Sequence, residues 1–163
     1  MNSTINWKKG IFKDTFEIYS SDTLIGTLKE NSWKQTATGE LNGTKISFRT
    51  KGFFTPETEL SDSERNIPIG RITYNTWKTK ATIEYNNKSA EWKYDNFMNT
   101  KWSLSNSEGV VLRYNGSFSK GEIAVLKQDE ILLLAGLFVT NYFRQRTSMV
   151  MLAVLLPMWI TLF

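Results

Sequence analysis

The sequence predicts a mainly β protein that ends in one buried, very hydrophobic helix. Two observations predict the sheet: apolar and polar residues alternate along short segments, and turn residues separate these segments at regular intervals. A third observation predicts the helix. Residues 131–139 are apolar on every side, and a helix of that kind must be buried in protein or in lipid. Roughly 11 or 12 strands fit before residue 127, a number typical of an antiparallel barrel or sandwich.

The alternation predicts which side chains face the core. In residues 45–49 and 89–94 every second residue is apolar, and its neighbours are polar or charged. We therefore expect Lys45, Arg49 and Lys93 to be exposed. The residues expected to point inward are Ile46, Phe48, Ala90, Trp92, Tyr94, Trp102 and Leu104.

Four Trp-Lys pairs recur along the chain. A surface of lysine and tryptophan can stack nucleic-acid bases or sit at a lipid interface. Adjacent residues of a strand face opposite sides, however, so the pattern favours tryptophans that point inward and lysines that point outward. This expectation applies to Trp7, Trp33, Trp77 and Trp92.

Part of the β region is an internal repeat. Residues 24–53 align with residues 68–97 at a constant offset of 44, and the identical pairs include Trp33 with Trp77 and Phe53 with Phe97. This alignment predicts two similar β-meander units. The acidic, serine-rich residues 57–64 lie between the units, and we expect them to form a solvated loop.

The C-terminal region divides into a helix and an apolar tail. Asp129 and Glu130 precede the apolar run, and Arg144 and Arg146 follow it, an arrangement that suits a helix macrodipole over residues 129–146. Such a helix is about 27 Å long. Three interpretations of the tail, residues 147–163, stay open: it spans a membrane, it packs against the barrel or a partner chain, or it lies in the bilayer interface or is disordered.

The β-meander followed by the segment Asp-Glu-Ile-Leu-Leu-Leu-Ala-Gly-Leu-Phe, residues 129–138, resembles the tubby-like superfamily. This group includes the tubby C-terminal domain, the phospholipid scramblases and the LURP-one-related proteins, and the chain is similar to its small bacterial members. The resemblance implies a closed antiparallel barrel of about 12 strands around a central helix, over residues 1–146. The helix residues then lining the barrel core are Ile131, Leu134, Gly136 and Phe138.

The composition excludes several kinds of chemistry. Without cysteine or histidine the chain forms no disulfide, no zinc site of the usual ligands and no imidazole-dependent catalytic triad. It contains no phosphate-binding loop motif, and the acidic residues 57–64 do not follow the spacing of an EF-hand. We therefore expect no catalytic residue, no cofactor and no metal. A net charge of +4 is also too small to indicate a nucleic-acid partner.

The function that these observations favour is a non-enzymatic binding or membrane-peripheral module. Its expected partners are anionic phospholipid, through Arg71, Lys78 and Lys80, or a protein that contacts residues 149–163. One alternative is the soluble head of a structural protein anchored at its C-terminus, and another is an enzyme that uses carboxylates. The N-terminus shows no secretory signal, so we expect a cytoplasmic protein, peripheral to or anchored in a membrane.

Overall fold

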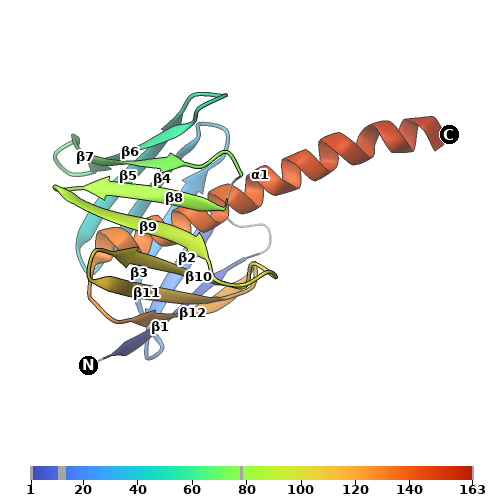
Figure 1. The fold of residues 1–163 in the computed structure, drawn as a ribbon. Helices are drawn as coiled ribbons and strands as arrows, with labels where there is room; N and C mark the ends of the chain where they lie inside the picture. Colours follow the sequence, from blue (N-terminus) through green and yellow to red (C-terminus); the bar gives the residue numbers. More distant parts are fainter. Residues whose placement is uncertain (1, 11–13, 78, 163) are drawn as a thin grey trace.

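The computed structural model describes residues 2–10, 14–77 and 79–162, which form a closed antiparallel barrel of twelve strands and one helix (Figure 1). Each strand pairs with its neighbours in sequence, and β1 closes the barrel against β12, with Ser3 opposite Val125. Closure leaves no free sheet edge. The strands are β1 (Ser3–Lys9), β2 (Thr15–Ser20), β3 (Thr23–Asn31), β4 (Thr36–Leu41), β5 (Thr44–Lys51), β6 (Glu57–Asp62), β7 (Ile67–Tyr74), β8 (Lys80–Tyr85), β9 (Lys88–Tyr94), β10 (Lys101–Asn106), β11 (Gly109–Gly116) and β12 (Lys120–Val125).

The alternation of the strands follows the prediction. Six of the seven side chains expected inside are buried, and Tyr94 is partly buried at the end of β9. Lys45, Arg49 and Lys93 are exposed, as expected. The sequence therefore identified which face of these strands is buried.

Residues 57–62 are a strand, β6, so the prediction of a solvated loop there is wrong. Thr58 and Leu60 are fully buried, whereas Glu57 is exposed. The buried Thr58 hydroxyl bonds to Thr50 at 2.7 Å and to Tyr74 at 2.6 Å. The sequence does not show this alternation, because threonine is a polar residue and Thr58 points inward all the same. Its hydroxyl can be buried because neighbouring hydroxyl groups satisfy it.

The repeated segments occupy equivalent strands. β3, β4 and β5 correspond to β7, β8 and β9 at the offset of 44 residues. Their pairing is equivalent too, since Gly26 lies opposite Leu41 and Gly70 opposite Tyr85. A Cβ atom at either glycine would collide with the backbone of the next strand, which explains the glycine at both places.

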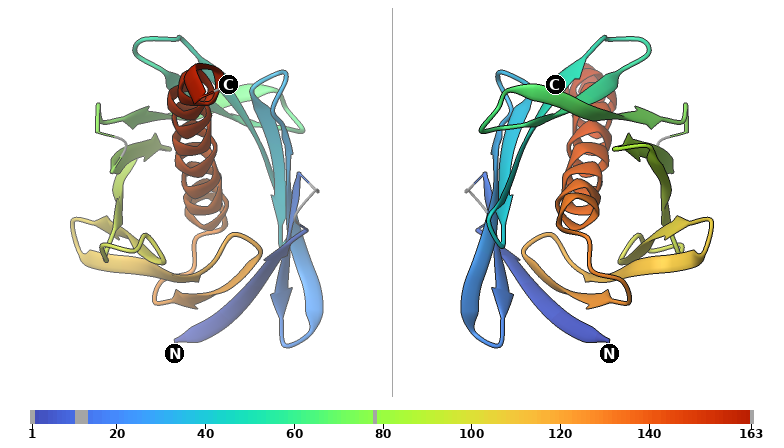
Figure 2. Two further views of the ribbon diagram at one scale, coloured as in Figure 1. Left: turned by 90° about the vertical axis from the view of Figure 1, so that its right-hand side faces the viewer. Right: turned by 90° about the vertical axis from the view of Figure 1, so that its left-hand side faces the viewer.

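The barrel is filled by the helix α1 (Glu130–Leu162), which runs along its axis (Figure 2). Asp129 caps its first turn by accepting the Leu132 amide at 3.0 Å, and the Tyr85 hydroxyl donates to the same carboxylate. Residues 132–139 are buried, apolar residues apart from one glycine. A barrel of this size has room for a helix, and the helix supplies the contacts that the inward side chains need.

The contacts of α1 are close along its buried length. Phe138 stacks on Phe48 with ring centroids 4.5 Å apart, and Leu134, fully buried, lies over Gly39. A Cβ atom on Gly136 would lie 2.7 Å from Cζ of Tyr114, so only glycine fits there. Ile131 is partly buried against the same core.

The helix does not end at residue 146. It continues to Leu162, and its final part extends away from the strands (Figure 1). The described side chains of Met149 and residues 153–157 are exposed, so these side chains do not pack against the barrel.

We expect Gly136→Asp to prevent folding, because it forces an unpaired charge into a closed contact with Tyr114 and Leu104. Burial of an unpaired charge costs several kcal/mol, which is comparable with the whole stability of a small domain. Deletion of residues 149–163 removes no buried apolar side chain of the described core, and the barrel should still unfold cooperatively. Circular dichroism melts compare the two variants.

The matched control is Met149→Asp, because it adds the same charge to an exposed position of the same helix. It should melt close to the unmodified protein. A Gly136→Asp variant with an equally cooperative melt would show that α1 is not the centre of the core.

Candidate functional site

The two ends of the barrel differ in what they display. We call the end where α1 leaves the barrel the exit end, and the opposite one the start end. At the exit end Arg144 donates to the carbonyl of Ser117, between β11 and β12, at 2.9 Å. At the start end Asn42, between β4 and β5, contacts Glu130 at 3.5 Å. The exit end therefore carries the connections that follow the odd-numbered strands, and the start end carries the others.

Exposed aromatic side chains gather at the exit end. Among the described residues, every exposed tryptophan or phenylalanine lies in an exit-end connection. Trp33 is 99% exposed and Phe97 98%, so these rings make almost no contact with the rest of the protein. The described exit-end side chains of this kind are Trp33, Phe53, Phe54, Trp77, Phe97, Met98 and Phe118. Of the described residues at the start end, three expose large apolar side chains, and all three are aliphatic: Leu24, Ile67 and Leu126.

The prediction that Trp33 and Trp77 point inward is therefore wrong, although it holds for Trp7 and Trp92, which are buried. The alternation rule applies within a strand, and Trp33 and Trp77 lie in the connections after β3 and β7. They do occupy matching places in the two repeats.

Asparagine side chains hold the loops that carry these rings. The Asn75 carboxamide oxygen accepts the amides of Thr79 and Lys80, at 2.9 and 3.0 Å. Asn96 accepts the amides of Thr100 and Lys101 in the same way, both at 3.0 Å. These bonds close the β7–β8 and β9–β10 loops, so Trp77 and Phe97 are displayed on ordered turns.

The charges of the two ends are opposite in sign. Counted from the last residue of one strand to the first residue of the next, the described exit-end connections hold six lysines and three acidic residues. The start-end connections, with the segment up to Glu130, hold three basic and six acidic residues. The aromatic end is therefore also the basic end.

The part of α1 beyond the exit end displays apolar side chains at its described positions. Met149, Val154, Leu155 and Leu156 each expose about half or more of their surface. The part of α1 after residue 146 is about 24 Å long at 1.5 Å per residue.

No helix in the part of the chain that the structure describes combines enough length with enough apolar character to span a bilayer.

Two arginines mark the place where α1 leaves the barrel. The Arg144 guanidinium lies over the rings of Trp102 and Phe118, at 5.1 and 4.9 Å from their centroids. Arg146 lies over Tyr142 at 5.1 Å. Cation–π contacts of this kind hold the charges at the rim.

A polar cluster fills the mouth of the barrel at the exit end. The side chain of Glu30, near the end of β3, accepts hydrogen bonds from Asn141 and, at 3.4 Å, from Gln145 of α1. Lys9, at the end of β1, donates to the carboxamide oxygen of Asn141 at 2.8 Å. We call these four residues the mouth cluster. Burial raises the pKa of Glu30 to about 7, and Lys9 opposes this shift.

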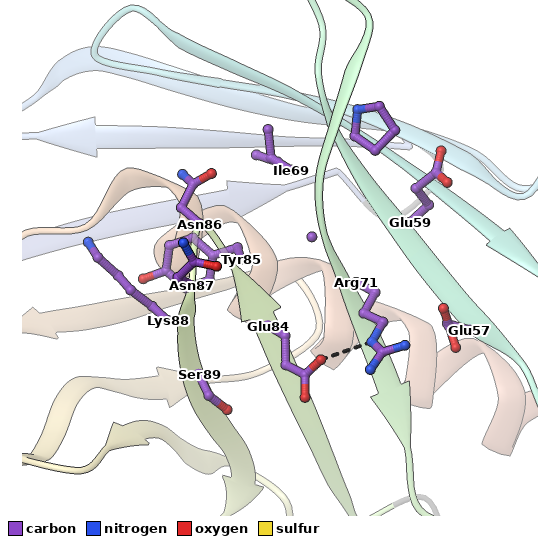
Figure 3. Close-up of a pocket in the computed structure, with 12 residues that line it drawn as sticks. Glu57, Glu59, Ile69, Arg71, Glu84, Tyr85, Asn86, Asn87, Lys88 and Ser89 are labelled. Atoms are coloured by element: carbon purple, nitrogen blue, oxygen red, sulfur yellow. Dashed lines mark hydrogen bonds and ion pairs between the residues drawn. The ribbon is translucent and has the colours of Figure 1, made fainter.

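The predicted lipid-contacting residues are not brought together as one group. Arg71 lies on the outer face of β7 and pairs with Glu84 at 2.9 Å, in a shallow hollow that Glu57 and Glu59 also line (Figure 3). Lys80 starts β8 at the exit end and is exposed. Lys78 lies outside the described residues.

Lys80 belongs to a different basic group. It faces Lys93 across β8 and β9, and Lys93 and Arg113 lie on either side of Ser103 in the pairing of β9, β10 and β11. Among the described residues, no carboxylate comes within 4.0 Å of these three charges. We call Lys80, Lys93 and Arg113 the basic row. The basic row could not be recognised from the sequence, because its members are far apart in the chain and only the strand register aligns them.

The described residues contain no group of three or more acidic side chains placed to hold a metal ion. Comparisons with protein-family models, with curated proteins and with solved structures found no match.

We expect Glu30→Gln to stabilise the protein at neutral and alkaline pH. Because the folded-state pKa of Glu30 is about 7, above the ordinary 4.5, the folded state holds a proton that the unfolded state has lost between these values. The contribution of Glu30 to stability is therefore greatest at acidic pH and is lost as the pH rises through this window. Above pH 7 the charged form costs about 3 kcal/mol, which Glu30→Gln removes.

Urea unfolding of both proteins across this pH range measures the effect. The stability difference between Glu30→Gln and the unmodified protein should grow from pH 4.5 to pH 7 and then level off. A constant difference would contradict the raised pKa. Asp14→Asn is the matched control, since Asp14 is exposed beside the cluster and its neutralisation should leave most of the pH dependence in place.

Proposed function

We propose that this protein is a non-enzymatic, membrane-peripheral module that docks on a bilayer with its exit end. In the docked state the aromatic rings of the exit-end loops enter the interface, and the end of α1 enters the hydrocarbon layer. The observation that carries the proposal is the location of every described exposed tryptophan and phenylalanine at this one end, around an exposed apolar helix.

The chemistry of these side chains supports a bilayer as the partner. Exposed apolar groups of this number are unfavourable in water, and a contiguous set of them marks an interaction surface. Tryptophan rings prefer the interface between headgroups and hydrocarbon, and an apolar helix end gains free energy from each methylene that it buries there. Trp33 and Trp77 sit on separate loops around α1, so a flat layer can receive the rings and the helix together.

The charge distribution supports an anionic bilayer. The basic exit-end connections face the membrane in this orientation, and the acidic start end faces away from it. Each lysine near an anionic surface contributes about 1 kcal/mol. Lys80, one of the predicted lipid-contacting residues, lies at this end and belongs to the basic row, whereas Arg71 already has Glu84 as its partner.

A second candidate function is a protein-binding one. The exposed side chains of Leu155 and Leu156 on α1 also suit a helix or a groove of a partner protein. In another alternative the C-terminus anchors the protein and the barrel is only its soluble head. This alternative differs from docking in one respect, because it does not require the aromatic loops to contact lipid. The resemblance to the tubby-like superfamily fits the barrel and its central helix, and membership stays a prediction.

We expect the triple variant Trp33→Ser, Trp77→Ser and Phe97→Ser to lose most of its binding to vesicles of phosphatidylcholine and phosphatidylglycerol. Each ring that leaves water contributes about 1 kcal/mol, so three substitutions should weaken binding roughly 100-fold. Vesicle flotation at equal protein concentration measures the loss. Thermal melts should show no change in fold, because these side chains are exposed.

Leu24→Ser with Ile67→Ser is the control, because it removes exposed apolar groups from the start end. It should float like the unmodified protein. If the triple variant floats fully and only deletion of residues 149–163 abolishes flotation, the helix is a simple anchor. Failure of the unmodified protein to float, together with self-association through residues 149–163, would favour the protein partner.

We expect Lys80→Glu with Lys93→Glu to weaken binding to the same vesicles at low salt by at least 10-fold, because two favourable charges become unfavourable. Salt should reduce this difference. The control is Lys45→Glu with Lys88→Glu, which makes the same change of charge at the beginning of β5 and β9, the start end. Equal losses in the two variants would show that net charge, and not the orientation of the barrel, determines binding.

A further inference from the structure

The mouth cluster connects β1, β3 and α1 at the exit end, and the buried carboxylate of Glu30 lies at its centre. Of the two oxygens of Glu30, one accepts from Asn141 and Gln145, and the other is buried without a hydrogen-bond partner. Lys9 reaches the far side of Asn141, so an amide separates the ammonium group from the carboxylate. Asn141 is itself buried. The arrangement holds α1 against β1 and β3 where the helix leaves the barrel.

Several charged and titratable groups face this carboxylate. Lys9 of β1 favours its ionised form, and Asp14, before β2, disfavours it. The hydroxyl of Tyr74, on β7, interacts electrostatically with Glu30 and with Arg146 of α1. The positive charge of Arg144, on α1, contributes to lowering the pKa of Lys9. Desolvation outweighs the attraction of Lys9, so the site favours the protonated form more than water does.

We propose that Glu30 couples docking to protonation: its carboxylate takes up one proton from solution when the exit end meets a bilayer, and the protein therefore binds membranes more tightly as the pH falls. This inference rests on the proposed docking function. The proton comes to rest on the oxygen that has no partner in the structure.

The physical cause is the loss of water from the mouth. Glu30 is three residues before Trp33, so a bilayer that receives the Trp33 ring also covers the mouth cluster. Removal of water penalises the charged carboxylate and leaves the neutral acid almost unaffected. The pKa of Glu30 is about 7 before docking, and a further rise on docking makes proton uptake part of binding at neutral pH. By linkage, protonation then favours docking by the same factor.

Flotation with vesicles of phosphatidylcholine and phosphatidylglycerol, from about pH 8.5 to about pH 5.5, tests the coupling; one proton changes the affinity by at most about tenfold per pH unit. The unmodified protein should bind about tenfold more tightly at the acidic end. Glu30→Gln should bind equally at both ends, with an affinity close to that of the protonated protein. Asp14→Asn is the matched control and should keep the pH dependence.

Lys9→Met provides a readout that a purely structural role of Glu30 would not change. Without the ammonium group the pKa of Glu30 rises, because Lys9 is the main group that lowers it. The midpoint of the pH-dependent binding should therefore move to higher pH, while the fold persists in thermal melts. An unchanged midpoint in a folded Lys9→Met protein would overturn the proposal.

The outcomes separate this inference from the docking function. Binding that does not vary with pH, or that varies equally in Glu30→Gln, would overturn the coupling and leave docking intact. Absence of binding at every pH would overturn both.

Discussion

The rest of the structure depends on the filling of the barrel by α1. Twelve strands enclose a space that their own inward side chains do not fill, and unfilled space costs the contacts along its whole lining. The fit is close enough to determine single residues on both sides. Gly136 accommodates Tyr114, and Gly39 accommodates Leu134. In addition, the Tyr114 hydroxyl donates to the carbonyl of Leu133 at 3.0 Å, so this buried polar group of the wall is satisfied by the helix itself.

A central helix also makes the two ends of the barrel different. The helix begins beside the last strand, crosses the interior once and has to leave at the opposite end. The start end is sealed by short polar turns and by the cap at Asp129. The exit end has to accommodate the change from a buried helix to an exposed one, and the mouth cluster with Arg144 provides the polar contacts of that transition. The buried carboxylate of Glu30 is a consequence of this geometry, because β3 ends where α1 emerges.

The sequence was sufficient for the parts of the fold that follow from periodicity. Alternation located Phe48 and Trp92, and the apolar run located the central helix. It was insufficient where burial and polarity disagree, as in β6, whose inward Thr58 is satisfied by hydroxyls on other strands. Of the proposed site, the sequence indicated Lys80 but not its alignment with Lys93 and Arg113, which only the register provides. The ring of loop aromatics was missed because Trp33 and Trp77 were taken for strand residues.

The internal repeat explains how several aromatic loops came to lie at one end. In a barrel of this kind each strand reverses the direction of the chain, so connections alternate between the two ends. The repeat offset of 44 residues moves the chain by four strands, from β3 to β7, which is an even number. Copies of a loop therefore return to the same end: Trp33 and Trp77 are one such pair, and Phe53 and Phe97 are another. An offset of an odd number of strands would have placed each copy at opposite ends. Duplication of one meander with two aromatic connections is thus enough to double these rings at the exit end and to add none at the start end.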